Sequence, residues 1–265
     1  MALPLVRSAC VAVLLAGSAT AQSPWLRYDA AMGSLPTAQG FFVRDDGWGP
    51  AATVHDGALF QGPTDFGTQH YWFANHELDF TRGVVVEGMI NVTTSTYRLG
   101  DCAQAIRFGY YMGAVDVAGR FAYIGIADSR LFVLTSASEV PSAEAEVVSL
   151  PMQNRWRDLK MVIKSTGIDL YADGEFLSHY PLGAEGEARG ASRMLFGDGT
   201  SCGSSRTQLR WVQVGPLAEC LADFNGDGFV DYSDYDAFVM CFEDEVCPEG
   251  KTADFNGDGF VDMFD

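Results

Sequence analysis

A ten-residue segment occurs twice near the C-terminus of this chain and severely restricts what that part can fold into. Residues 222–231 read ADFNGDGFVD, and residues 253–262 repeat the same ten letters. In each copy, oxygen-bearing side chains alternate with glycine and apolar residues. Ca²⁺ takes about 6–8 oxygen ligands, and a 12-residue loop supplies them from positions 1, 3, 5, 7, 9 and 12. Both copies are therefore predicted to be calcium-binding loops.

Every liganding position of such a loop is filled in both copies. The predicted ligands of the first loop are Asp223, Asn225, Asp227, the carbonyl oxygen of Phe229, Asp231 and Asp234. The predicted ligands of the second loop are Asp254, Asn256, Asp258, the carbonyl oxygen of Phe260, Asp262 and Asp265. Gly228 and Gly259 stand where the loop turns sharply and needs a positive φ. The alternative is a pair of acidic turns, since Asn, Asp and Gly also form ordinary turns. Two complete matches in one register favour calcium.

Both loops end in aspartate, whereas the general EF-hand pattern ends in a bidentate glutamate. This ending resembles the dockerin modules of bacterial secreted polysaccharide-degrading systems. The resemblance implies a cohesin-type protein domain as partner. The residue pairs before the last ligands, Tyr-Ser at 232–233 and Met-Phe at 263–264, differ from the small hydroxyl pair often met in cohesin-binding dockerins.

The segment after the first loop, residues 235–242, carries apolar side chains at helical spacing and is predicted to be a helix. The sequence ends at Asp265, so the second repeat is expected to be truncated, without a following helix. Residues 218–265 form the predicted dockerin-like segment.

Charge is concentrated in this segment. Residues 218–265 hold 14 acidic residues and one basic residue, a balance of −13, so the rest of the chain carries only −5 of the total −18. Without metal these carboxylates repel one another, and bound calcium relieves that repulsion, which couples metal binding to folding. Nucleic acid is excluded as a partner, because phosphate binding requires a basic face.

The N-terminus has the features of a secretory signal peptide. Arg7 precedes an apolar run from residue 9 to residue 16, and Ala19-Thr20-Ala21 provides a small-x-small cleavage site. We predict a signal peptide over residues 1–21, cleaved after Ala21, and a soluble exported mature chain. No stretch reaches the ~18 consecutive apolar residues of a transmembrane helix, so no membrane span is expected.

Five cysteines remain after cleavage of the signal, an odd number for an oxidising compartment. Cys241 and Cys247 flank a short step between the two repeats and could form a disulfide there. Cys102 and Cys202 could join two loops of the larger domain, and Cys220 has no evident partner. The spacing does not settle the connectivity.

Residues 22–217 follow the pattern of an all-β domain. Short β-branched and apolar segments at 83–92, 122–126 and 130–134 are separated by turns rich in Gly, Asp and Ser. Segments 158–164, 167–172 and 175–177 predict consecutive hairpins, the second closed by Asp173-Gly174, a favoured two-residue connection. Long amphipathic helices are absent from the pattern. We therefore predict one antiparallel β-sandwich of the jelly-roll type, followed by the small calcium-loop and helix segment.

The sequence WRDLKMVI at 156–163, followed by IDLYADGE at 168–175, is similar to a hairpin of concanavalin A-like and laminin G-like jelly rolls. The closing RWVQV at 210–214 is similar to the final strand of such domains. The resemblance implies a carbohydrate-binding or adhesion module, or a glycoside hydrolase built on the same sandwich. Because fold does not imply function, both alternatives stay open.

A hydrolase needs two carboxylates facing each other across the glycosidic bond. Jelly-roll glucanases carry them on one strand as E-x-D-x-x-E or E-x-D-x-E. Glu77 and Asp79 begin like that motif, but no second glutamate follows. We interpret these two residues as solvated side chains at a strand edge, and we identify no catalytic residue.

Aromatic residues crowd the first third of the larger domain and could stack on sugar faces. They are Trp25, Phe41, Phe42, Trp48, Phe60, Phe66, Tyr71, Trp72 and Phe73. Core packing is the simpler role for most of them. Trp48, between two glycines, is the best candidate for an exposed ring. We predict a secreted, non-catalytic carbohydrate-binding or scaffold protein that binds Ca²⁺; the rivals are a polysaccharide hydrolase and a purely structural surface protein.

Overall fold

The computed structural model describes the chain in several ranges and divides it into two compact units. The described residues are 23–45, 52–62, 70–97, 109–135, 147–182, 191–198, 203–217, 224, 232–244, 247–248 and 252–254. One unit is Gln22–Leu217, and the other includes Ala218–Asp265. Each is described by itself.

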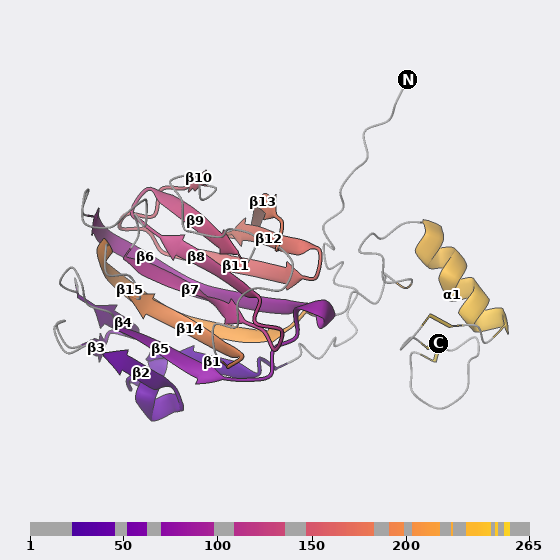
Figure 1. Cartoon of the computed structure of the whole chain (residues 1–265), viewed down its shortest axis with the longest axis horizontal. Helices are drawn as coiled ribbons and strands as arrows, with labels where there is room; N and C mark the ends of the chain where they lie inside the picture. Colours follow the sequence, from indigo (N-terminus) through magenta and orange to yellow (C-terminus); the bar gives the residue numbers. More distant parts are fainter. Residues whose placement is uncertain are drawn as a thin grey trace, which may run out of the picture. The chain divides into compact units, whose positions relative to one another are not determined.

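The larger unit is a sandwich of two antiparallel sheets (Figure 1). In the first sheet the strand order is β13-β12-β11-β6-β15-β4-β3, and β1 pairs with β15. Its strands are β1 (Leu26–Asp29), β3 (Thr53–His55), β4 (Ala58–Gln61), β6 (Val84–Tyr97), β11 (Arg157–Lys164), β12 (Gly167–Ala172), β13 (Glu175–Tyr180) and β15 (Gly203–Pro216). We call it the eight-stranded sheet.

The second sheet has the strand order β10-β9-β8-β7-β14-β5-β2, and we call it the seven-stranded sheet. Its strands are β2 (Phe42–Asp45), β5 (His70–Asn75), β7 (Tyr110–Val115), β8 (Phe121–Ile126), β9 (Arg130–Thr135), β10 (Val147–Ser149) and β14 (Arg193–Asp198). Three short 3₁₀ turns lie among the described connections: η1 (Ala30–Met32), η2 (Pro36–Gln39) and η3 (Phe80–Arg82).

The main core lies between the sheets, because alternate residues of each strand point inward. Phe196 on β14 is fully buried there, with its ring 5.8 Å from Tyr28 of β1 and 5.6 Å from Trp72 of β5. Val86 and Ile90 of β6, on the opposite sheet, are equally buried. The predicted all-β antiparallel sandwich is confirmed.

The predicted hairpins at 158–177 are also confirmed. Strands β11 and β12 pair from Leu159–Ala172 to Lys164–Gly167, and β12 continues through a tight turn into β13. In that turn Asp173 and Gly174 have φ of 52° and 83°, the left-handed conformation that the Asp-Gly connection was expected to adopt. The hairpins form one edge of the eight-stranded sheet rather than its centre.

The C-terminal unit contains α1 (Tyr232–Asp244), which confirms the helix predicted after the first loop. Phe224, Cys241 and Ala253 are buried together in a small core, and the rings of Phe224 and Phe238 meet edge to face at 5.5 Å. Phe224 belongs to the first repeat and Ala253 to the second, so described residues of both repeats share one core with the helix.

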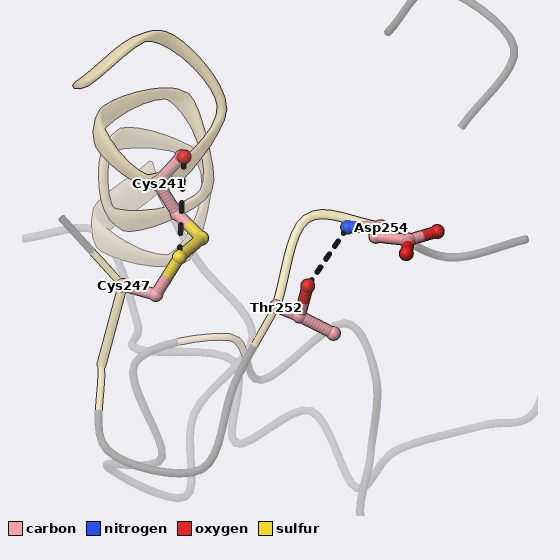
Figure 2. The surroundings of a disulfide bond; sticks show 4 residues. All are labelled: Cys241, Cys247, Thr252 and Asp254. Atoms are coloured by element: carbon pink, nitrogen blue, oxygen red, sulfur yellow. Dashed lines mark hydrogen bonds between the residues drawn. A yellow bond between two sulfur atoms is a disulfide. The ribbon is translucent and has the colours of Figure 1, made fainter. Parts of the chain in front are cut away.

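The predicted disulfide between Cys241 and Cys247 is confirmed. It ties the last turn of α1 to the segment that leads to the second repeat (Figure 2). The pairing proposed for Cys102 and Cys202, and the partner of Cys220, lie outside the described residues. No helix in the described part of the chain is both long and apolar enough to cross a membrane.

Candidate functional site

The outer face of the seven-stranded sheet carries a second apolar cluster, separate from the core between the sheets. Strand alternation and the cross-strand register show that these residues point away from the main core. The cluster consists of Val115, Phe121, Ala127, Phe132, Leu134 and Leu195, with Phe73, Tyr111 and Tyr123 partly buried against them. The six core members of this cluster are at most 8% exposed, whereas Phe73, Tyr111 and Tyr123 keep part of their surface open, so these partly exposed rings form the candidate contact surface.

Aromatic rings form a continuous series across this face, which we call the ring series. Its members in spatial order are Phe42 (β2), Phe73 and Tyr71 (β5), Tyr111 (β7), and Tyr123 and Phe121 (β8). The successive ring centroids lie 5.6, 6.2, 6.0, 5.7 and 5.2 Å apart. These are distances at which aromatic pairs attract one another beyond their simple burial.

Glycines on the same face make room for the rings. Gly113 of β7 lies directly opposite Tyr123, and a Cβ at Gly113 would overlap the Tyr123 ring and the carbonyl oxygen of Ala122. Gly197 of β14 has φ of 133°, and a Cβ there would approach the backbone and Cβ of Tyr71. The rings can therefore lie close against the sheet, as glycine opposite an aromatic residue allows.

The Tyr111 phenol is held in its protonated form. Burial raises the pKa of Tyr111 well above its usual value, and the neighbouring Tyr71 and Tyr123 raise it further, while Arg193 lowers it. A neutral phenol offers both a donor and an acceptor to a ligand hydroxyl.

The outer face of the eight-stranded sheet is polar and serves as a contrast. A row of residues crosses it from β1 to β13: Arg27, Gln213, Glu87, Lys160, Tyr171 and Phe176. Arg27 donates to Gln213, Gln213 donates to Glu87 at 2.5 Å, and the Lys160 ammonium lies 5.9 Å from the Tyr171 ring. This is the polar face expected of a solvated antiparallel sheet.

The aromatic residues that crowd the first third of the larger domain have different environments in the structure. Phe42, Tyr71 and Phe73 belong to the ring series, whereas Phe41 and Trp72 are buried in the main core. Trp25 stacks on His76, and Phe60 stacks on His55. Trp48, the preferred candidate for an exposed ring, and Phe66 lie outside the described residues.

Sequence reasoning missed half of the ring series, namely Tyr111, Tyr123 and Phe121. The signal was present in the segments YYMGAV at 110–115 and FAYIGI at 121–126, where aromatic residues and a glycine follow one another at every second position and so share one face. The strand order is needed to interpret this pattern, because it places residues about 40 positions apart in the chain side by side.

Glu77 and Asp79 do not form a carboxylate pair on a strand. They lie between β5 and η3, where Glu77 is exposed and Asp79 is the residue before the 3₁₀ turn. Asp79 Oδ1 accepts hydrogen bonds from the Thr81 backbone N–H at 2.9 Å and the Thr81 hydroxyl at 2.6 Å. These bonds lower the pKa of Asp79, so this side chain caps a turn as a carboxylate.

Few of the predicted calcium ligands belong to the described residues. Asp234 is buried in the first turn of α1. The Asp254 backbone N–H donates to the Thr252 hydroxyl at 3.0 Å, a local turn at the start of the second loop (Figure 2). No group of three or more His, Cys, Asp or Glu side chains arranged for metal binding occurs among the described residues. The other predicted ligands fall outside them.

A comparison of the sequence finds no matching family model and no matching curated protein. Among solved structures, a carbohydrate esterase from the Shiga toxin-encoding bacteriophage phi24B is similar with a TM-score of 0.52 and 16% identity, over 74% of this chain and 100% of that chain. An endo-acting O-glycanase of the human gut microbiota gives 0.48 and 14%, over 74% and 100%. The lumenal domain of VIP36 in its Ca²⁺/Man2-bound form gives 0.45 and 9%, over 73% and 88%. At 16% identity the similarity to the esterase shows a shared fold and nothing about function.

Proposed function

We propose that this protein is an exported, calcium-binding and carbohydrate-binding protein, whose carbohydrate ligand lies on the ring series of the seven-stranded sheet. The observation that carries the proposal is the unbroken line of six rings from Phe42 to Phe121 on an outer sheet face. This line of rings supports the hypothesis that aromatic side chains, rather than catalytic carboxylates, recognise the ligand.

Sugar rings suit this surface for a physical reason. A pyranose presents apolar C–H groups on its flat faces and hydroxyls around its edge. Tyrosine rings combine an apolar face with a polar tip, so they can pack against the flat face of the sugar and hydrogen-bond its hydroxyls. Rings spaced about 5–6 Å apart along a line can contact successive parts of an extended polysaccharide chain.

The chemistry of this face favours binding over glycoside hydrolysis. Hydrolysis requires an acid and a base on either side of the scissile bond. Within the described strands of the seven-stranded sheet, no Asp or Glu occupies an outward position, because Asp45 and Asp198 both point inward, on the side of His70 and Trp72. Asp79, the other candidate, caps η3.

The calcium segment is proposed to rigidify and present the C-terminal unit. Its donor set of carboxylates and amide oxygens is the set that Ca²⁺ prefers. Asp234, the last predicted ligand of the first loop, is buried in the first turn of α1. Ca²⁺ would supply charge neutralisation for the acidic loops. By its resemblance to dockerins, this unit would bind a cohesin-type domain outside the cell.

A matched pair of exposed phenylalanines tests the carbohydrate site. Phe42 is 58% exposed on edge strand β2, with its ring 5.6 Å from Phe73. Phe176 is 48% exposed on β13, the edge strand of the eight-stranded sheet, with its ring 5.6 Å from that of Tyr171 on the neighbouring β12. On a glycan array and by affinity electrophoresis, Phe42→Ala should weaken retention by up to about tenfold, since an aromatic contact contributes about 0.5–1.5 kcal/mol beyond its buried area. Phe176→Ala should leave retention unchanged.

Two results would contradict the proposal. Equal retention by the parent and by a Phe42→Ala/Tyr123→Ala double variant would move the site off the ring series. Release of reducing sugar from a bound polysaccharide, abolished by neutralising a single carboxylate, would show an enzyme instead.

A further inference from the structure

We propose that the ligand of the ring series is an anionic polysaccharide, one that carries uronate or sulfate groups. This inference rests on the proposed function and specifies its ligand class. The observation behind it is the distribution of charge on the outer face of the seven-stranded sheet.

Three arginines and no acidic residue occupy outward positions on the described strands of this sheet. Arg44 lies on β2, Arg130 on β9 and Arg193 on β14. Outside residues 218–265 the chain carries a net charge of −5, so an average face of the larger unit would hold slightly more acids than bases. Its composition is reversed with respect to the chain that carries it.

Two of these arginines border the ring series, whereas Arg130 lies on the same face away from the rings. Arg44 is the cross-strand neighbour of Tyr71. The Arg193 guanidinium lies 5.7 Å from the centroid of Phe73, within range of a cation–π contact. Arg130 follows the same face at the far strand, next to Ser149 of β10.

Arginine is suited to this role. Its planar guanidinium binds carboxylate and sulfate oxygens through paired hydrogen bonds while its flat face stays stacked on an aromatic ring. A sugar acid that rests on Phe73 would bring its charged group to the edge of the ring, where Arg193 lies. The other sheet shows the ordinary pattern, in which Arg27, Glu87 and Lys160 alternate in sign along one row.

The experiment compares two ligands that differ only in charge: an oligogalacturonate of defined length and its carboxyl-reduced, neutral form. A sulfated galactan oligosaccharide of similar length is the third ligand. Binding to the full chain is measured by calorimetry at low and high salt. The parent should bind the charged oligosaccharide at least tenfold more tightly than the reduced one, and the difference should shrink as salt screens the charges. A preference for the sulfated ligand over the uronate would support the inference with sulfate as the anionic group.

Arg193→Gln should weaken binding of the charged ligand by about tenfold, the usual effect of losing a charge-assisted hydrogen bond, and leave the neutral ligand nearly unaffected. The matched control is Arg210→Gln, because the Arg210 guanidinium lies 4.4 Å from the Trp156 ring outside the proposed site. Arg44→Gln should have the same effect on the charged ligand, and because Arg44 is exposed, this substitution should not disturb the fold. Thermal unfolding of each variant verifies that it is folded.

Equal affinity of the parent for the charged and the reduced oligosaccharide would overturn this inference. If Phe42→Ala still weakened that binding, the proposed carbohydrate site would stand and only the anionic class would fail. If no ligand in the panel bound the parent at all, both proposals would fail.

Discussion

Tyr111 and Tyr123 meet edge to face on neighbouring strands, with ring centroids 5.7 Å apart on the outer side of the seven-stranded sheet. Each tyrosine lies directly opposite a glycine of the neighbouring strand, and that glycine stands two residues from the other tyrosine: Gly113 pairs with Tyr123, and Gly125 pairs with Tyr111. The reciprocal arrangement gives each ring a flat place on the adjacent backbone.

The glycine opposite Tyr123 should be essential for the shape of this surface. A Cβ in Gly113→Ala would overlap the Ala122 carbonyl and the Tyr123 ring, so the strand pair must shift. We expect a loss of about 2–3 kcal/mol and a fall in the unfolding temperature of about 5–10 °C, together with weaker glycan binding. Gly215→Ala is the control, because its Cβ would come no closer than 3.2 Å to Pro24. Similar unfolding temperatures for the two variants would contradict this account.

Stability should fall in alkaline solution because of buried tyrosines. Burial raises the pKa of Tyr110 well above its usual value, and that of Tyr28 and Tyr111 likewise. The folded state thus holds these protons more tightly than the unfolded chain, whose tyrosines lose them near pH 10. The contribution is complete below about pH 9 and is lost as the pH rises past 10. Denaturant midpoints measured from pH 7 to pH 11 should decline above pH 10.

Tyr110→Phe should make that alkaline decline less steep, since it removes one of the phenols. Tyr235→Phe, at an exposed position of α1, is the control and should leave the decline as it is. A decline of the same steepness in the parent and in Tyr110→Phe would assign the alkaline effect to other groups.

The hairpin between β7 and β8 depends on a buried ion pair. Asp116 accepts from the backbone N–H groups of Ala118 and Arg120 at 3.0 and 2.8 Å, and its other oxygen lies 2.6 Å from an Arg120 guanidinium nitrogen. Asp116→Asn leaves the Arg120 charge without its partner, so we expect a loss of about 3–5 kcal/mol. Chemical denaturation measures it.

Asp79→Asn is the matched control for that variant, because Asp79 makes a similar cap on Thr81 in an exposed setting. Asparagine caps about as well as aspartate, so the change should stay within about 0.5 kcal/mol. Comparable losses in the two variants would show that burial of the Asp116 charge is not what matters.

The two predicted calcium loops should bind independently measurable ions. Asp227 and Asp258 occupy the same position of the two loops. Titration of the chelator-stripped protein with Ca²⁺ should show two sites in the parent and one fewer in Asp227→Ala or Asp258→Ala, since each variant loses a charged ligand. Far-UV circular dichroism should gain helical signal on calcium addition. Asp236→Ala, an exposed position on α1, should bind as the parent does. An absence of heat in the parent would sink the calcium hypothesis.

Much of the fold was predictable because it depends on local chemistry. The β-branched segments, the Asp173-Gly174 turn and the apolar spacing after the first loop specify strands, a hairpin and a helix over a few residues each. The link between Cys241 and Cys247 was one of the pairings that the sequence suggested, since the two lie only six residues apart, and the structure selects it. The calcium ligands remain a prediction, because their assignment depends on the repeated ten-residue sequence and most of them lie outside the described residues.

The candidate binding face was not predictable, because it joins residues that are distant in the chain. Phe42 and Phe121 stand at opposite ends of one line of rings only because β2, β5, β7 and β8 belong to the same sheet in the order that the structure shows. Alternation along a strand says that a side chain faces one of two sides, but it does not say which side meets the other sheet. Pairing between distant strands determines which side faces the other sheet. It therefore determines which rings belong to the core and which lie on the outer face.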